Sequence, residues 1–135
     1  HAVTAIRGTM LFGAIEGINV YAKPLNYPMA GGEVFVATAG GTIGTPYDLS
    51  CPASMVMTGA TIHLTGYTPS PGELTQLSID CKTPTDLSGP VGATVGPAGT
   101  PSSFSFPLAC PAGKKVIVVQ GQVSSVMHGL GLLCR

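Results

Sequence analysis

Apolar side chains alternate with polar or small ones along short stretches of this chain. Leu77, Ile79 and Cys81 occupy every second position of one such stretch, with serine and aspartate between them. A period of two residues is typical of a β-strand that has one face in a core and the other in solvent. Stretches of this kind, rich in Val, Ile and Thr and bounded by glycine or proline, are predicted to be strands. They span residues 3–8, 17–23, 33–39, 47–51, 55–66, 74–81, 92–95, 103–110, 115–126 and 130–134.

Long helices are not expected. No helix-length window shows apolar residues at the i, i+3, i+4, i+7 spacing, and 12 prolines are spread along the chain. A chain of 135 residues is long enough to form one domain with a core of its own. We therefore predict a single all-β domain that covers residues 1–135.

A tandem repeat organises the predicted strands. The phrase LSCPAS at 49–54 returns as LACPAG at 108–113, and each is followed by a strand-rich run that ends on a second cysteine. A shorter stretch at 17–23 matches the ends of both runs, with alanine in place of cysteine. Because a Greek-key unit of three or four antiparallel strands cannot bury its apolar face alone, the units are expected to share one core, as in a β-prism or a β-sandwich. The predicted division is a partial repeat at 1–23 and full units at 24–82 and 83–135.

Four cysteines lie at matching places in the two units, at Cys51 and Cys81 and at Cys110 and Cys134. Four cysteines allow three pairings, and the duplication favours one disulfide within each unit. The spacing is not that of a zinc site, and free buried thiols in a cytosolic protein are the alternative. Together with His1 in place of an initiating methionine, the disulfides predict an extracellular protein, secreted after removal of a leader.

Charge is scarce in this chain. Charged residues make up 9% of the sequence, and the formal net charge is zero. The basic surface of a nucleic-acid binder is therefore missing, as is that of a protein that binds anionic lipid, and no apolar run is long enough to insert into a membrane. A neutral, apolar-rich surface suits contact with other subunits, because net charge keeps soluble proteins apart. The alternative is a compact monomeric β-domain with small exposed residues.

No catalytic constellation is evident in the sequence. The six acidic residues are scattered singly, GxSxG is absent, and Gly-Lys-Lys at 113–115 lacks the spacing of a phosphate-binding loop. We predict no enzyme activity and no cofactor. A remote alternative is a copper enzyme in which His1 binds the metal together with His63 or His128. Loops rich in Ser, Thr and Pro are either solvated turns or sites of O-linked glycans. These loops are 68–72, 82–90 and 98–103.

Several motifs resemble those of jacalin-like β-prism domains, particularly their disulfide-bearing microbial relatives. Gly40-Gly41 precedes the aromatic Tyr47 and the Cys51-Pro52 turn, and the stretches MVMTGATI and LTQLSIDC follow. The resemblance extends over most of the chain. It implies a prism of three Greek-key sheets, often a sugar-binding module.

The resemblance also bears on a sugar site. The family's pocket relies on an aspartate in the loop before the last strand, and this chain has none there. The resemblance then implies Glu73 in place of the acid and Tyr67 as the stacking aromatic. Otherwise Glu73 is a solvated loop charge and Tyr67 closes a strand end.

The function predicted first is structural. We predict an extracellular protein that assembles with copies of itself into a filament or coat. In this interpretation the partial repeat 1–23 leaves sheet edges open, and an open edge is a template for a strand of another chain. Contacts of this head-to-tail kind propagate into filaments when they do not close into rings. The predicted contact residues are Val3, Ile6, Met10, Leu11 and Phe12.

A lectin of the jacalin-like type is the competing prediction. In it residues 1–23 complete a sheet of their own chain, and glycans are the partners.

Overall fold

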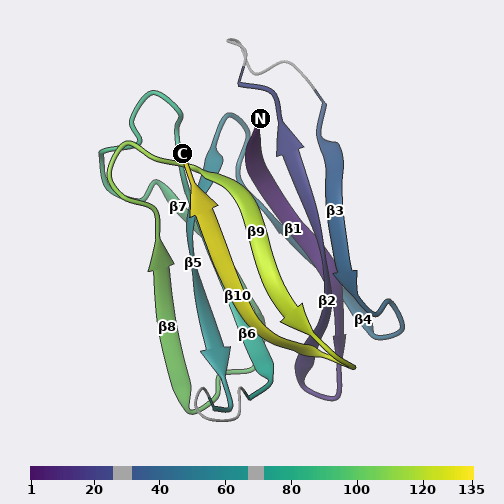
Figure 1. Cartoon of the computed structure of the whole chain (residues 1–135). Coiled ribbons are helices and arrows are strands. Elements are labelled where there is room, and N and C mark those ends of the chain that lie inside the picture. Colours follow the sequence, from purple (N-terminus) through teal and green to yellow (C-terminus); the bar gives the residue numbers. More distant parts are fainter. Residues whose placement is uncertain (26–31, 67–71) are drawn as a thin grey trace.

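The computed structural model describes residues 1–25, 32–66 and 72–135, and these residues form ten strands. Figure 1 shows the strands arranged as separate sheets around one interior. The described residues include no helix that is long and apolar enough to cross a membrane. The strands are β1 (Ala2–Leu11), β2 (Ala14–Lys23), β3 (Val34–Gly40), β4 (Thr45–Ser50), β5 (Val56–Leu64), β6 (Leu74–Lys82), β7 (Ala93–Gly99), β8 (Phe104–Ala109), β9 (Val116–Val123) and β10 (Met127–Cys134).

The strands pair into three antiparallel sheets. Sheet A has the order β3-β2-β1-β4, and sheet B has the corresponding order β7-β6-β5-β8. In each, two consecutive strands form an inner hairpin, and the next two strands flank it on either side. Sheet C consists of the hairpin β9–β10. The prediction of an all-β protein built from Greek-key units is confirmed.

The core lies between the three sheets and is filled mainly by the inner hairpins. Ile6 of β1, Leu77 and Ile79 of β6, and Met127 of β10 are all fully buried there. These residues follow the two-residue alternation of their strands, so one face of each hairpin is apolar and the other is polar or small. The burial of one face therefore fixes the register of each hairpin.

The three inner hairpins have the same internal register. Each has one irregularity near the start of its first strand and another next to its turn. Aligning these irregularities makes residues of the three sheets comparable one by one. The paired residues nearest each turn irregularity are Thr9 with Gly17, His63 with Gln76, and Gln122 with Gly129.

The sheets begin and end elsewhere than the predicted repeats. Unit 24–82 supplies the flanking strands of sheet A and the hairpin of sheet B, and unit 83–135 does the same for sheets B and C. Residues 1–23 are not a half unit with open edges, because β1 and β2 form the centre of a complete four-stranded sheet. When repeats are arranged around an axis, the boundary between one repeat and the next can be placed at any point of the repeating unit. Sequence similarity alone does not show which boundary coincides with that of a sheet.

Both disulfides form with the predicted pairing, and each joins two sheets. Cys51 follows β4 of sheet A and is bonded to Cys81 in β6 of sheet B. Cys110 follows β8 of sheet B and is bonded to Cys134 in β10 of sheet C. The duplicated element is therefore a covalent link between neighbouring sheets.

Candidate binding site on sheet A

A hollow of about 600 Å³ opens on the outer face of sheet A. We call it the Arg7 site. Its position follows from strand alternation, since Ile6 and Ile18 point into the core and their neighbours Arg7 and Asn19 point out. The residues that carry its polar groups are Arg7, Thr9, Asn19, Thr42 and Asp48.

The polar residues of the Arg7 site stand in register across the sheet. Arg7 of β1 is paired with Asp48 of β4 on one side and with Asn19 of β2 on the other, and Asn19 is paired with Thr38 of β3. This row brings together residues that are far apart in sequence. A guanidinium, a carboxylate, an amide and a hydroxyl thus share one exposed surface.

Arg7 is fixed by three polar partners and one aromatic ring. Its Nη2 lies 2.8 Å from Glu33 Oε2 and donates to Ser50 Oγ at 2.9 Å, and its Nε lies 3.0 Å from Asp48 Oδ2. The guanidinium carbon is 4.5 Å from the centre of the Tyr21 ring. Burial alone would lower the pKa of Arg7, but the hydrogen bonds and charges of Glu33 and Asp48 raise it overall, so the side chain stays a cation.

Two aromatic side chains border the Arg7 site. Tyr21 and Phe35 pack edge to face, with ring centres 5.8 Å apart and an interplanar angle of 69°. Phe35 is 54% exposed, so much of its ring is open to solvent. The aromatic rings of Tyr21 and Phe35 therefore offer a flat apolar surface next to the hydrogen-bonding groups of the Arg7 site.

Glu16 holds the glycine-rich loop that forms one wall of the site. Glu16 is 2% exposed, and its Oε2 accepts hydrogen bonds from Thr9 Oγ1 at 2.7 Å and from the Gly44 N–H at 2.8 Å. Its Oε1 accepts the Ile43 N–H at 3.2 Å. These hydrogen bonds, that of Thr9 first, lower the pKa of Glu16 because they favour the ionised form. A side chain at Gly41 would collide with Oε1 of this carboxylate, so the loop needs glycine there.

The Glu16 interactions predict a pH dependence of stability. A carboxyl whose pKa is lower in the folded than in the unfolded state stabilises the fold above its unfolded pKa, and this contribution is lost as the pH falls through the folded pKa. We expect Glu16→Gln to lower the free energy of unfolding at neutral pH and to reduce its fall below the ordinary pKa of 4.5. Urea unfolding between about pH 7 and pH 3 would measure this.

The matched control for Glu16→Gln is Glu73→Gln, which removes a carboxyl from an exposed residue. It should leave the unfolding free energy at neutral pH nearly unchanged, because surface charges contribute little. Equal pH profiles for Glu16→Gln and the unaltered chain would contradict the role given to Glu16.

The charged row of sheet A has no counterpart in the other sheets. By register, Arg7, Asn19 and Asp48 correspond to Thr61, Ser78 and Pro107 in sheet B. Sheet B has the same strand order without an ion pair at these positions. The fold therefore does not require the residues of the Arg7 site.

The structure does not bring the sugar-binding residues predicted from sequence to this site. Glu73 directly precedes β6 of sheet B, where it is exposed and its backbone N–H donates to Thr65 Oγ1 at 2.8 Å. Tyr67 lies outside the described residues. Sequence reasoning missed Arg7, Asn19 and Asp48. One feature of the sequence could have identified Arg7. It is an arginine in the middle of a predicted strand, in a chain in which only 9% of the residues are charged.

The predicted subunit contacts lie on β1 and its turn, and they differ in accessibility. Val3 and Ile6 are buried in the chain's own core at 1% and 0% exposure, so neither can contact another subunit in this fold. Met10 and Leu11 are half-buried, and Phe12 is almost fully exposed in the turn after β1. Because β1 is paired with β2 and β4, its edges are not open to another chain.

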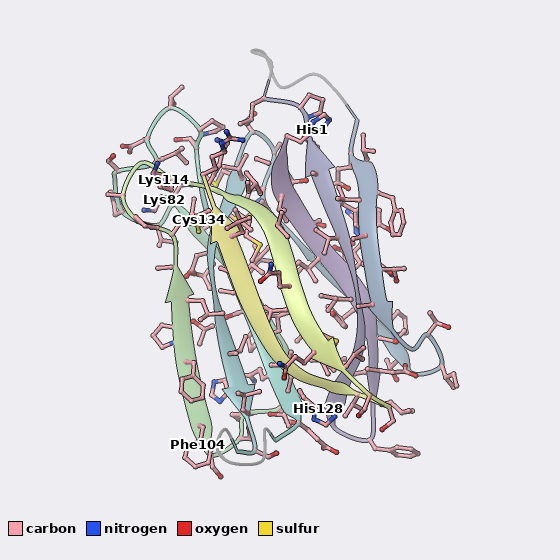
Figure 2. The ribbon with its side chains drawn as sticks, in the orientation of Figure 1. His1, Lys82, Phe104, Lys114, His128 and Cys134 are labelled. Atoms are coloured by element: carbon pink, nitrogen blue, oxygen red, sulfur yellow. A yellow bond between two sulfur atoms is a disulfide. The ribbon has the colours of Figure 1, made fainter. Side chains whose placement is uncertain are left out.

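The histidines do not gather into the copper site considered from sequence. Figure 2 shows His1 and His128 at opposite ends of the molecule. His63 lies near the end of β5, where its Nδ1 is 3.3 Å from the backbone nitrogen and oxygen of Ser102. In the described ranges no three potential metal ligands cluster.

Several proteins of known structure resemble this chain over nearly its whole length. No family model and no curated protein matches the sequence. Solved structures do match it. A Malaysian banana lectin has a TM-score of 0.69 and 16% identity, over 100% of this chain and 84% of its own. Calystegia sepium agglutinin has a TM-score of 0.71 and 13% identity, over 100% and 83%. A mannose-binding jacalin-related lectin from Ananas comosus has a TM-score of 0.69 and 14% identity, over 99% and 82%.

The chain has the β-prism fold of the jacalin-related lectins. The resemblance seen in the sequence is thus confirmed for the fold. At sequence identities this low, a structural match shows the fold but does not show which residues form a binding site. The matched β-prism proteins are lectins and not enzymes.

Proposed function

We propose that this protein is a carbohydrate-binding β-prism protein without catalytic activity, and that the Arg7 site binds the sugar. The observation that carries the proposal is the difference between sheets A and B. Both have the same strand order, but only sheet A has a guanidinium, an amide and a carboxylate in one row across its outer face. Polar groups that the fold does not need are the ones available for binding.

The hydrogen-bonding groups of the Arg7 site fit a sugar. Three N–H groups of Arg7 are directed at Glu33, Asp48 and Ser50, so its remaining two can donate to a ligand. Asn19 accepts from Thr38 Oγ1 through Oδ1, at 2.7 Å, and keeps its amino group as a donor. The Asp48 side chain is 59% exposed and can accept from hydroxyl groups. Neighbouring hydroxyls of a sugar both donate and accept, as this set requires.

The matched structures support the same class of ligand. Calsepa lectin was solved with a biantennary N-glycan, and the Ananas comosus protein is described as mannose-binding. A lectin from Artocarpus hirsuta is described as galactose-specific. These ligands differ, so they support a carbohydrate and do not select one sugar.

The proposal includes an extracellular location. The chain has two disulfides. Disulfides persist in oxidising compartments and are rare in the cytosol. Glycans on a cell surface or in a matrix would be accessible there.

Removal of the Asp48 charge should weaken sugar binding. A hydrogen bond to a charged group contributes about 1.5–3 kcal/mol, so Asp48→Asn is expected to lower affinity roughly 10- to 100-fold for the best ligand of a glycan array. Folding should hardly change, because ion pairs as exposed as Asp48 with Arg7 contribute about 0–1 kcal/mol. Isothermal titration calorimetry, with thermal unfolding beside it, measures both.

The matched control for Asp48→Asn is Thr61→Ala, at the sheet B position that corresponds to Arg7. It should leave affinity unchanged. A chain that binds no glycan, or an Asp48→Asn variant that binds as well as the unaltered chain, would overturn the proposal.

Self-assembly is a second candidate, and one observation favours it: the edges of sheet C have no strand partner in the described part of the chain. A filament contact made by strand pairing at these edges would then involve sheet C and not β1, whose two edges are already paired. Negative-stain electron microscopy with light scattering near neutral pH tests this. Regular filaments would support it, and a monomer at every concentration would exclude it.

A further inference from the structure

The outer face of sheet A continues past the Arg7 site to the aromatic pair of Tyr21 and Phe35. We infer that this face binds a neutral oligosaccharide, with one sugar unit in the Arg7 site and the next packed against the Phe35 ring. The inference rests on the proposed function and adds a second subsite and a class of ligand to it.

Strand register places the two subsites next to each other. In the polar row Asn19 of β2 pairs with Thr38 of β3. Two positions further along β2, Tyr21 pairs with Phe35. Side chains two positions apart on a strand lie on the same face of the sheet, about 7 Å apart. A sugar over the Phe35 ring would therefore be the direct neighbour of a sugar in the polar row.

The Phe35 ring is the open apolar surface of the second subsite. The guanidinium carbon of Arg7 lies 4.5 Å from the centre of the Tyr21 ring and so covers one face of that ring. Phe35 packs edge to face with Tyr21, and more than half of Phe35 is exposed. Neither ring lines the hollow of the Arg7 site. A sugar in the hollow therefore leaves Phe35 free to pack against the apolar C–H face of a second sugar.

A loop bounds the hollow on the side away from the aromatic pair. Residues 41–44 form this loop, and hydrogen bonds to the Glu16 carboxylate hold it. The loop directly follows the β3 residue that pairs with Gly17, whereas Tyr21 lies on the other side of Asn19 along β2. A chain that begins in the hollow therefore extends across the polar row toward the aromatic pair.

Sheet B does not repeat the aromatic pair. By register Tyr21 corresponds to Asp80, and Phe35 corresponds to Thr94. In sheet B these two residues form a hydrogen bond, in which Thr94 Oγ1 donates to Asp80 Oδ1 at 2.8 Å. The fold therefore does not require aromatic rings at these positions, and the rings of sheet A are available for binding.

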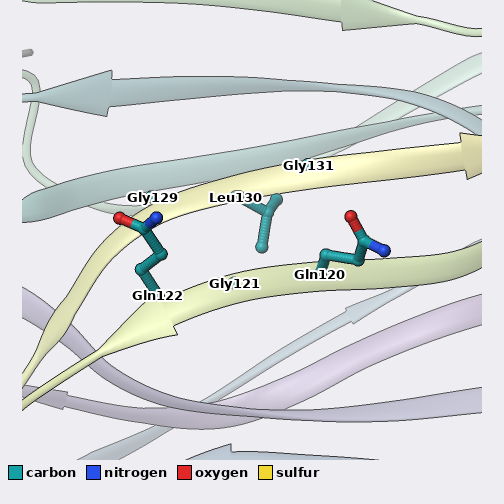
Figure 3. Close-up of a pocket in the computed structure, with 6 residues that line it drawn as sticks. All are labelled: Gln120, Gly121, Gln122, Gly129, Leu130 and Gly131. Atoms are coloured by element: carbon teal, nitrogen blue, oxygen red, sulfur yellow. The ribbon is translucent and has the colours of Figure 1, made fainter.

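Sheet C has a hollow at the corresponding place but lacks the same groups. The hollow measures about 550 Å³, and Figure 3 shows Gln120, Gln122 and Leu130 among its six lining residues. By register Gln120 takes the place of Arg7. None of the six lining residues is charged or aromatic. A hollow with a charged row and an adjacent aromatic pair is therefore a property of sheet A and is not repeated at the corresponding positions of the other two sheets.

The charges on the outer face of sheet A favour a neutral ligand. Glu33 and Asp48 are both paired with Arg7. Lys23 lies two positions beyond Tyr21 on the same face of β2. Two cations and two carboxylates leave this face without net charge. An acidic sugar would find no excess of positive charge to offset the loss of its own hydration, whereas neutral hydroxyl groups match the mixture of donors and acceptors.

Binding as a function of chain length tests the inference. The probes are the methyl glycosides of mannose, galactose, glucose and N-acetylglucosamine, and unbranched oligomers of each with two to four units. For the sugar that binds the intact protein, we expect the oligomers to bind roughly tenfold more tightly than the methyl glycoside, because part of the exposed Phe35 ring is removed from water. Isothermal titration calorimetry measures both affinities. An unbranched uronic acid oligomer of equal length should bind more weakly.

The ratio of the oligomer affinity to the methyl glycoside affinity is the readout for variants. Phe35→Ala should reduce this ratio to about one, and Phe35→Tyr, which keeps a ring, should retain most of it. Because both sugars are measured on the same variant, partial misfolding does not change the ratio. The matched control is Thr94→Ala, at the sheet B position that corresponds to Phe35, and it should leave the ratio unchanged.

Three results would overturn the inference and leave the proposed function in place. The methyl glycoside binds as tightly as its oligomers, Phe35→Ala keeps the ratio of affinities, or the acidic oligomer binds more tightly than the neutral one. If Phe35→Ala keeps the ratio but changes the oligomeric state, the ring belongs to a contact between copies of the chain. If no sugar binds at any length and a glycan array is also negative, the proposed function fails and the inference fails with it.

Discussion

Replacing Cys51 and Cys81 together by alanine is expected to lower the free energy of unfolding by about 3–4 kcal/mol. The bridge closes a loop of 30 residues, and cross-linking a loop of this size removes that much entropy from the unfolded chain in the loop-closure model. The bridge also joins sheet A to sheet B, so its loss frees the two largest sheets to separate. Urea unfolding under non-oxidising conditions measures the change.

The second bridge is the matched control. Cys110 and Cys134 close a loop of 24 residues, so the loop-closure model predicts nearly the same loss when both are replaced by alanine. The manner of unfolding should differ. This bridge holds the two-stranded sheet C, and its removal should allow the hairpin to open locally before the rest unfolds. Unchanged unfolding free energies for both double variants would contradict the role of the bridges.

Much of the fold could be predicted from local patterns. Alternation such as that of Leu77, Ile79 and Cys81 identifies strands, because a half-buried strand is the regular structure whose side chains repeat every two residues. The duplicated Leu-x-Cys-Pro phrase identified the disulfide pairing. What it could not show is that each bridge crosses between sheets. That depends on which strands pair, and pairing between distant strands leaves no local signal.

The candidate site was much harder to predict. Arg7, Asn19 and Asp48 meet only because β1, β2 and β4 pair in one particular register. A shift of one residue would turn Arg7 into the core and Ile6 outwards. The register also shifts at irregularities such as the one between Thr9 and Met10, and no sequence motif marks their positions. A site that depends on the register of paired strands therefore cannot be recognised from the sequence before the strand pairing is known.

Leu77→Ala is expected to lower the free energy of unfolding by about 2–5 kcal/mol, because Leu77 is fully buried and the neighbouring strands cannot collapse into the cavity. The matched variant is Leu130→Ala, at the corresponding position of sheet C. Leu130 is only half-buried, so its truncation should cost about 1 kcal/mol or less. Urea unfolding of the two variants compares the same residue type in the same register with and without flanking strands.

Equal losses for Leu77→Ala and Leu130→Ala would contradict this comparison. They would mean that the core at Leu130 is as well covered in solution as the core at Leu77. The half-buried state of Leu130 would then not follow from the lack of flanking strands beside β9 and β10 in the described residues.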